Sequence, residues 1–171
     1  MRLAAPALAA GNAEAHASRM SEHRATARWM RGEKSFTYET YPRTHRWVFG
    51  GGAELDASSA PEYLGDAALP NPEEALVMAL SSCHMLSFLA IAARKRLTVD
   101  SYEDAAVGHM EKNAEGRLAV TRVELHPRVV FSGANRPSRD ELQKLHEQAH
   151  HVCFIANSVK TEITVRDRTR A

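Results

Sequence analysis

The chain has 171 residues, of which 44% are hydrophobic and 25% charged, and its formal net charge at neutral pH is +1. This length and composition are typical of a single folded domain with a hydrophobic core of its own. A charge so close to neutral gives no electrostatic basis for binding nucleic acid or an anionic membrane. Two cysteines are too few for a disulfide scaffold.

The first 22 residues are rich in alanine and show no periodicity. We expect them to form a disordered leader ahead of one domain spanning residues 23–171. The run 3–10 resembles a secretion signal only weakly, because it is short and interrupted by Pro6. A cytoplasmic location is therefore expected.

The segment after the leader has the pattern of β-strands. Residues 25–30 and 35–41 flank a turn that contains Gly32, which predicts a hairpin. A third short strand is expected over 43–49, where three consecutive glycines end it. Residues 53–70 are predicted to form a long irregular loop, and loops of that length are usually functional or mobile.

A long helix is predicted from residue 71 to residue 96. Asn71 is suited to cap it, Pro72 to occupy its first position, and Glu73 to match the positive end of the helix dipole. Three consecutive basic residues, 94–96, complement the negative end. Residues 75–93 between these ends carry no formal charge.

This uncharged stretch approaches the length of a membrane span, which needs about 20 apolar residues. Ser81, Ser82 and His84 make its centre too polar for a lone span. We therefore predict a helix that is buried nearly all round inside a soluble protein. Cys83 lies at the middle of this helix.

Two further strands, 99–111 and 118–131, are predicted around a turn at 113–116. Ser138 and Glu141 have the spacing of a capping box and mark the start of a second helix. Its apolar stripe is formed by four residues: Leu142, Leu145, Ala149 and Val152. A last strand is expected over 160–165.

The candidate chemistry lies at Cys83 and Cys153. Free cysteines are often no more than small buried hydrophobes, and that interpretation stays open. In a cytosolic protein, however, such a pair is more often redox-active, catalytic or metal-binding than structural. A nucleophilic Cys83 needs a positive partner to stabilise its thiolate, and the helix dipole fades within the first turn.

Arg43 and Arg46 are the candidate partners of the thiolate, because both lie among aromatic residues rather than in a solvated charge run. A buried arginine needs a carboxylate to offset its desolvation, and Glu73 could supply one or simply match the helix dipole. Ten helical residues separate Glu73 from Cys83 by about 15 Å. An arginine that bridges the two is therefore more plausible than direct contact.

These residues resemble the OsmC/Ohr superfamily, the osmotically inducible protein C and organic hydroperoxide resistance proteins. The resemblance rests on the motif Asn71-Pro72-Glu73-Glu74, on Cys83 ten positions after Glu73, and on the late Cys153. It covers roughly residues 25–165. His84 departs from the family pattern, which has an aromatic residue after the first cysteine, and residues 154–158 lack the family's proline.

The resemblance implies an α+β fold in which mostly antiparallel sheets wrap a long central helix, within an intertwined homodimer. It also implies a thiol peroxidase without a cofactor. Cys83 would be the peroxidatic cysteine, oxidised to a sulfenic acid, and Cys153 would resolve it as a disulfide. Glu73 would hold an arginine over the thiolate, with Arg46, Arg43 or Arg31 as candidates.

Two rival interpretations remain. Four donors, Cys83, His84, His151 and Cys153, with His150 beside them, could bind zinc, although adjacent helical residues point about 100° apart. Alternatively, the chain is a non-catalytic dimer that binds apolar ligands.

The remaining histidines, His109, His126 and His146, are expected on the surface. Tyr41, Trp47 and Phe49 are expected in the core or, failing that, along an apolar substrate site. The prediction is a cytoplasmic dimeric peroxidase that reduces organic hydroperoxides, or hydrogen peroxide less well. An external dithiol, such as a lipoyl group, would regenerate it.

Overall fold

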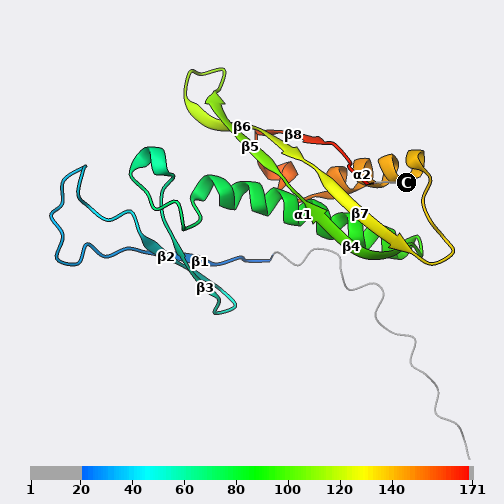
Figure 1. The fold of residues 1–171 in the computed structure, drawn as a ribbon, viewed down its shortest axis with the longest axis horizontal. Coiled ribbons are helices and arrows are strands. Elements are labelled where there is room, and N and C mark those ends of the chain that lie inside the picture. The colour runs from blue at the N-terminus through cyan, green and yellow to red at the C-terminus, as the bar shows by residue number, and fades with distance from the viewer. Residues whose placement is uncertain (1–20, 170–171) are drawn as a thin grey trace, which may run out of the picture.

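The structure is a computed structural model that describes residues 21–169, so most of the predicted leader lies outside the described residues. It has the predicted α+β architecture, with two helices packed against strands (Figure 1). The helices are α1 (Pro72–Arg94) and α2 (Arg139–Val152), with short 3-10 turns η1 (Pro61–Tyr63) and η2 (Ala156–Ser158). The strands are β1 (Ala25–Arg28), β2 (His45–Phe49), β3 (Glu54–Ala57), β4 (Thr98–Asp104), β5 (Val107–Lys112), β6 (Leu118–Leu125), β7 (Pro127–Ser132) and β8 (Glu162–Val165).

The strands form three small sheets, with the orders β1-β2-β3, β4-β7 and β5-β6-β8. All pairs are antiparallel except β6 with β8. The two long strands predicted after α1 are each divided in two, although the turn between them is confirmed at Asn113–Gly116. At the division, a carboxylate oxygen of Asp104, at the end of β4, accepts the backbone N–H of His126, between β6 and β7, at 2.6 Å.

The predicted hairpin between residues 25–30 and 35–41 is wrong, because β1 pairs directly with β2 and residues 35–41 form no strand. Their polar groups are satisfied within the loop, where the Thr40 hydroxyl contacts those of Ser35 and Thr37. Tyr41 packs against Trp29 and Phe36. The predicted long loop also contains β3, which extends the sheet.

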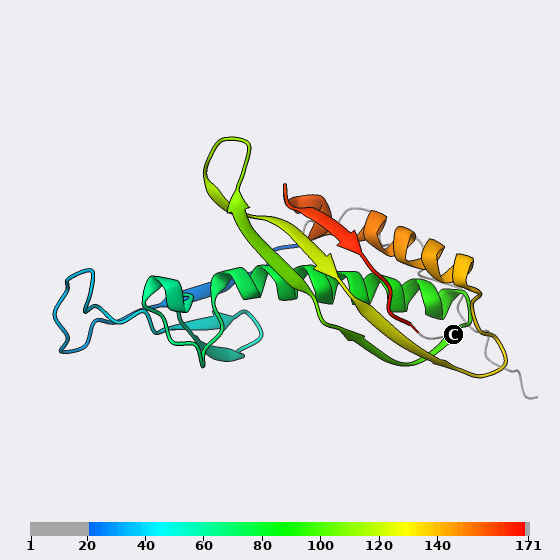
Figure 2. The same cartoon turned by 45° about the horizontal axis from the view of Figure 1, so that its top comes forward.

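Helix α1 begins with the predicted cap: Asn71 accepts the N–H of Glu74, and the Glu74 carboxylate accepts the N–H of Asn71. The helix contacts α2 and the strands β4, β5 and β6, which lie along it in Figures 1 and 2. Phe88, at 0% exposure, lies in the cluster shared with α2. Leu80 packs in a second cluster with residues of β6.

The prediction that α1 is buried nearly all round is wrong for the single chain. Met78 is 67% exposed and Leu86 60% exposed, because the sheets and α2 cover only part of the helix surface. By length and composition, α1 could cross a membrane, with 23 residues and a mean hydropathy of 1.9. Its contacts with α2 and with β4, β5 and β6 identify it instead as the core helix of the domain.

Helix α2 also begins with its predicted capping box, formed by Ser138 and Glu141. Three of the four stripe residues, Leu142, Leu145 and Ala149, are buried against α1 and the strands. Val152 is 47% exposed, so this part of the prediction is wrong. The helix ends at Val152, beyond the buried face, and His146 joins that face instead.

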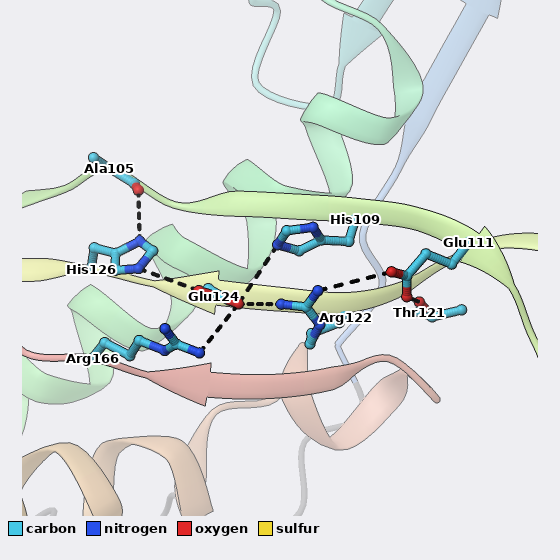
Figure 3. A network of polar contacts seen from close by, with 8 residues as sticks. All are labelled: Ala105, His109, Glu111, Thr121, Arg122, Glu124, His126 and Arg166. Carbon is cyan, nitrogen blue, oxygen red and sulfur yellow. Dashed lines mark hydrogen bonds and ion pairs between the residues drawn. The ribbon is translucent and has the colours of Figure 1, made fainter.

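A network of charged side chains surrounds Glu124 on the β5-β6-β8 sheet (Figure 3). The Glu124 carboxylate pairs with Arg122 on its own strand and lies 3.4 Å from Arg166, just after β8. His109 and His126 face the same carboxylate at 3.7 and 3.5 Å. His126 is only 8% exposed, so the prediction of a surface position is wrong for it.

We expect Glu124→Gln to lower the free energy of unfolding by about 1–3 kcal/mol. The amide keeps the shape of the side chain but removes the charge that pairs with Arg122 and Arg166. Urea denaturation measures the difference. The control is Glu115→Gln, because the exposed pair between Glu115 and Arg117 should contribute about 0–1 kcal/mol. Equal losses in the two variants would contradict a central role for Glu124.

Candidate thiol site

The two cysteines lie on the two helices that face each other in the core. Cys83 is in the middle of α1 and partly exposed, whereas Cys153 caps the C-terminal end of α2 and is 1% exposed. Both are free thiols. Helices α1 and α2 thus bring together residues that are seventy positions apart in the sequence.

Cys83 and Cys153 are close enough for their thiols to interact. Burial first, and then the interaction with the Cys83 thiol, raise the pKa of Cys153 to about 11. The backbone N–H of Ala156 points at the sulfur of Cys153, with an N–Sγ distance of 3.5 Å. This donor and the N–H of Ile155 lower the pKa but do not outweigh burial. Cys153 therefore keeps its proton at neutral pH.

The structure places the candidate arginines in the N-terminal segment. Arg46 is exposed on β2 and forms ion pairs with Glu54 and Asp56 of β3, at 3.1 and 2.9 Å. Arg43 lies over the ring of Tyr41, with its guanidinium carbon 3.6 Å from the ring centroid. Arg31 donates to a backbone carbonyl of its own turn. Within residues 21–169, none of the three is hydrogen-bonded or ion-paired with Glu73.

Glu73 lies in the first turn of α1, at the edge of an open groove of about 1690 Å³. The groove lies between the N-terminal sheet, formed by β1, β2 and β3, and the first turns of α1. Trp47 and Phe49 line it, but Tyr41 does not, because Tyr41 packs against Trp29 and Phe36 between β1 and β2. Cys83 is not among the residues that line the groove. The structure therefore brings Cys83 and Cys153 together but keeps the other predicted site residues apart from them.

A buried histidine pair lies near the thiols, so the predicted surface position of His146 is wrong. His84 is 1% exposed and His146 is 4% exposed. Their rings are stacked at an interplanar angle of 8°, and Nε2 of His84 lies 3.1 Å from Nδ1 of His146. The other nitrogen of His146, Nε2, faces a carboxylate oxygen of Asp167 at 3.8 Å. The sequence carried one signal, since His146 falls within the apolar stripe of α2.

Within the histidine pair, the imidazole of His84 is uncharged at neutral pH. Burial, followed by the neighbouring His146 and His150, lowers the pKa of His84 to about 4. The pKa of Asp167 is lowered, whereas the pKa of a buried carboxylic acid is usually raised. Burial alone would raise the pKa of Asp167, but the neighbouring His146 and hydrogen bonds from Thr169 lower it overall.

The lowered pKa of His84 predicts a pH-dependent stability. The unfolded chain binds more protons than the folded one between pH 4 and pH 6.5, so stability falls as the pH falls through this window. The loss should approach about 3 kcal/mol. Urea denaturation at several pH values measures it, and His84→Phe should flatten the slope between pH 4 and 6.5.

The control for this pH dependence is His151→Gln, because His151 is exposed on the same helix as His146. Its slope should equal that of the unaltered protein. An unchanged slope in His84→Phe would contradict the assignment to His84.

The four predicted zinc ligands do not converge. His151 points to solvent, and His84 is bonded to His146. In the described part of the chain, no group of three or more His, Cys, Asp or Glu side chains is arranged to hold a metal ion.

Comparison with known proteins gives a consistent family. Residues 65–166 match the family described as OsmC-like protein. An OsmC-like protein of unknown function from Vibrio cholerae is 49% identical, with a TM-score of 0.84 over 86% of this chain and 99% of that chain. No functionally curated protein gives a significant match.

Two more distant structures share the fold. An organic hydroperoxide resistance protein OsmC from Legionella pneumophila is 19% identical, with a TM-score of 0.63 over 90% of this chain and 100% of that chain. An organic hydroperoxide resistance protein from Elizabethkingia anophelis is 20% identical, with a TM-score of 0.65 over 88% of this chain and 96% of that chain.

Proposed function

The chain belongs to the OsmC-like protein family, and on that premise we propose that it is a cysteine-based peroxidase that reduces organic hydroperoxides. The single observation that carries this proposal is that the partly exposed thiol of Cys83 is close enough to the buried thiol of Cys153 to affect its ionisation. Two relatives of the same fold are named organic hydroperoxide resistance proteins, which agrees with this substrate class.

The difference between the two sulfurs supports Cys83 as the peroxidatic cysteine and Cys153 as the resolving one. Cys153 is 1% exposed and, with a pKa of about 11, keeps its proton. A peroxide can therefore reach only Cys83, and a thiolate in this pair would be that of Cys83, accepting a hydrogen bond from Cys153. A thiolate, rather than a thiol, is the nucleophile in this chemistry.

The reaction takes place in two steps. The thiolate of Cys83 attacks one peroxide oxygen, the O–O bond breaks, and the leaving alkoxide takes up a proton to become an alcohol. Cys83 is then a sulfenic acid. The sulfur of Cys153 attacks it, the S–O bond breaks, and the hydroxide leaves as water with the proton of Cys153. An external dithiol reduces the resulting disulfide.

The proposal also includes a homodimer and an arginine beside the thiolate. Exposed apolar residues on α1, Met78 and Leu86, and on the N-terminal sheet, Phe49 and Leu55, support association with a second copy. In such a homodimer, Arg43 or Arg46 could approach the thiolate with Glu73. Sedimentation of the purified protein tests the association.

One equivalent of cumene hydroperoxide provides the test of the peroxidase. Two thiols per chain should disappear, and peptide mapping without reductant should find Cys83 joined to Cys153. Retention of both thiols would exclude the peroxidase and favour the second candidate, a dimer that binds apolar ligands. The groove of about 1690 Å³ lined by Trp47 and Phe49 is the observation in favour of that candidate.

A further inference from the structure

A second polar link joins α1 to α2 beside the thiols. His84 directly follows Cys83 on α1, and His146 lies seven residues before Cys153 on α2. The 3.1 Å hydrogen bond between these imidazoles therefore crosses the same helix interface as the thiol contact. Around it the interface is apolar, with Phe88 stacked on His146 at a centroid distance of 4.5 Å.

The polar contacts of this pair continue from α1 through α2 to the C-terminal segment. Nε2 of His84 and Nδ1 of His146 share one hydrogen bond. Nε2 of His146 lies 3.8 Å from a carboxylate oxygen of Asp167, beyond hydrogen-bond distance. We call these three residues, Asp167, His146 and His84, the histidine array. It connects the segment after β8 to α2 and then to α1.

We propose that the histidine array is a positioning element that fixes the register of α1 against α2 and so holds Cys83 and Cys153 in reacting contact. This inference rests on the proposed function of the two thiols. Apolar side chains tolerate sliding of one helix along another, and a shift of one turn is about 5.4 Å. A disulfide needs alpha carbons within about 4.4–6.8 Å of each other, so such a shift would separate the sulfurs.

The histidine array raises the free energy of the shifted arrangement. Sliding the helices would leave two buried imidazoles without a partner, and each unsatisfied buried group costs about 1–3 kcal/mol. A single buried polar residue fixes helix register in coiled coils in the same way. Asp167 lies at the outer end of the array, where its carboxylate is 3.8 Å from Nε2 of His146.

The test replaces both imidazoles together. The double variant His84→Phe/His146→Phe keeps two stacked rings beside Phe88 and leaves no orphaned nitrogen, so the fold should survive. Asp167→Asn is the milder second variant, because it keeps the shape of the side chain that faces His146 and removes only its charge. The control is His126→Phe, which removes another buried histidine that bonds the carbonyl of Ala105, in a different part of the fold.

The first measurement is the reduction potential of the Cys83–Cys153 disulfide, titrated in dithiothreitol buffers. In the double variant we expect the thiols to lose about tenfold in effective concentration, which corresponds to a rise in potential of about 30 mV. Asp167→Asn should shift it in the same direction by less. His126→Phe should leave it unchanged, even if it lowers stability.

The second measurement is the rate of disulfide closure after oxidation by peroxide, which should fall about tenfold in the double variant while the first oxidation of Cys83 is unchanged. A folded double variant with the potential of the unaltered protein would overturn the proposal. If that variant does not fold, an unchanged potential in Asp167→Asn overturns it. The titration uses no peroxide, so it separates a failure of this inference from a failure of the peroxidase proposal.

Discussion

Cys83→Ser is expected to lower kcat/KM for organic hydroperoxides by at least about 1000-fold, or about 4 kcal/mol of activation free energy. A serine hydroxyl is not ionised at neutral pH and cannot form the sulfenic acid on which the second step depends. Cys153 cannot replace it, because Cys153 is 1% exposed and its pKa is near 11. Peroxide consumption in the presence of excess dithiol measures the loss.

Two control measurements show whether the loss of activity comes from the missing thiol or from misfolding. Thermal unfolding should be nearly unchanged, because serine has almost the size of cysteine. The remaining thiol of Cys153 should react slowly with a thiol reagent in the folded variant and at once after unfolding. If Cys83→Ser kept a tenth or more of the activity, another group would have to be the nucleophile.

Features set by neighbouring residues were predictable from the sequence. Asn71 with Glu74, and Ser138 with Glu141, form the capping boxes that start both helices. Each depends on contacts within one turn, so the residue spacing alone is sufficient. The turn after β5 was predicted for the same reason, since Asn113 and Gly116 supply its local hydrogen bonds.

Features set by contacts between residues distant in the sequence were not predictable from it. Residues 35–41 have the composition of a strand, but β1 pairs with β2 and leaves that segment to fold on itself around Thr40 and Tyr41. The uncharged sequence of α1 predicted burial on every side. Which side is covered depends on where the sheets lie, and Met78 and Leu86 remain exposed in one chain.

The same distinction between local and distant contacts holds for the candidate site. The cysteine pair was predicted from a motif whose spacing lies along the chain. The histidine array depends on α1 packing antiparallel to α2, so His84 and His146 meet across 62 positions. No spacing rule encodes that contact, although a histidine within the apolar stripe of α2 was a signal. Arg46 and Arg43 instead contact residues of the N-terminal segment, which no pattern along the chain predicted.

Cys153→Ser is expected to separate the two chemical steps. The first oxidation of Cys83 should proceed within about threefold of its normal rate, because the peroxide and the leaving alcohol meet only the outer sulfur. Turnover with a dithiol that attacks the internal disulfide should fall by at least about 100-fold, since that disulfide cannot form. One thiol per chain would be consumed in place of two.

The trapped product identifies the order of the cysteines. With Cys153 replaced, the sulfenic acid of Cys83 has no internal thiol to attack it, so it should persist and react with dimedone, as mass spectrometry can detect. Excess peroxide should then oxidise it further to the sulfinic acid. The matched control is Cys83→Ser/Cys153→Ser, which should give no adduct. A dimedone adduct on Cys153 in the Cys83→Ser variant, with none on Cys83 in Cys153→Ser, would reverse the assignment. That outcome would require the buried sulfur to become accessible and lose its proton first, against both its burial and its raised pKa.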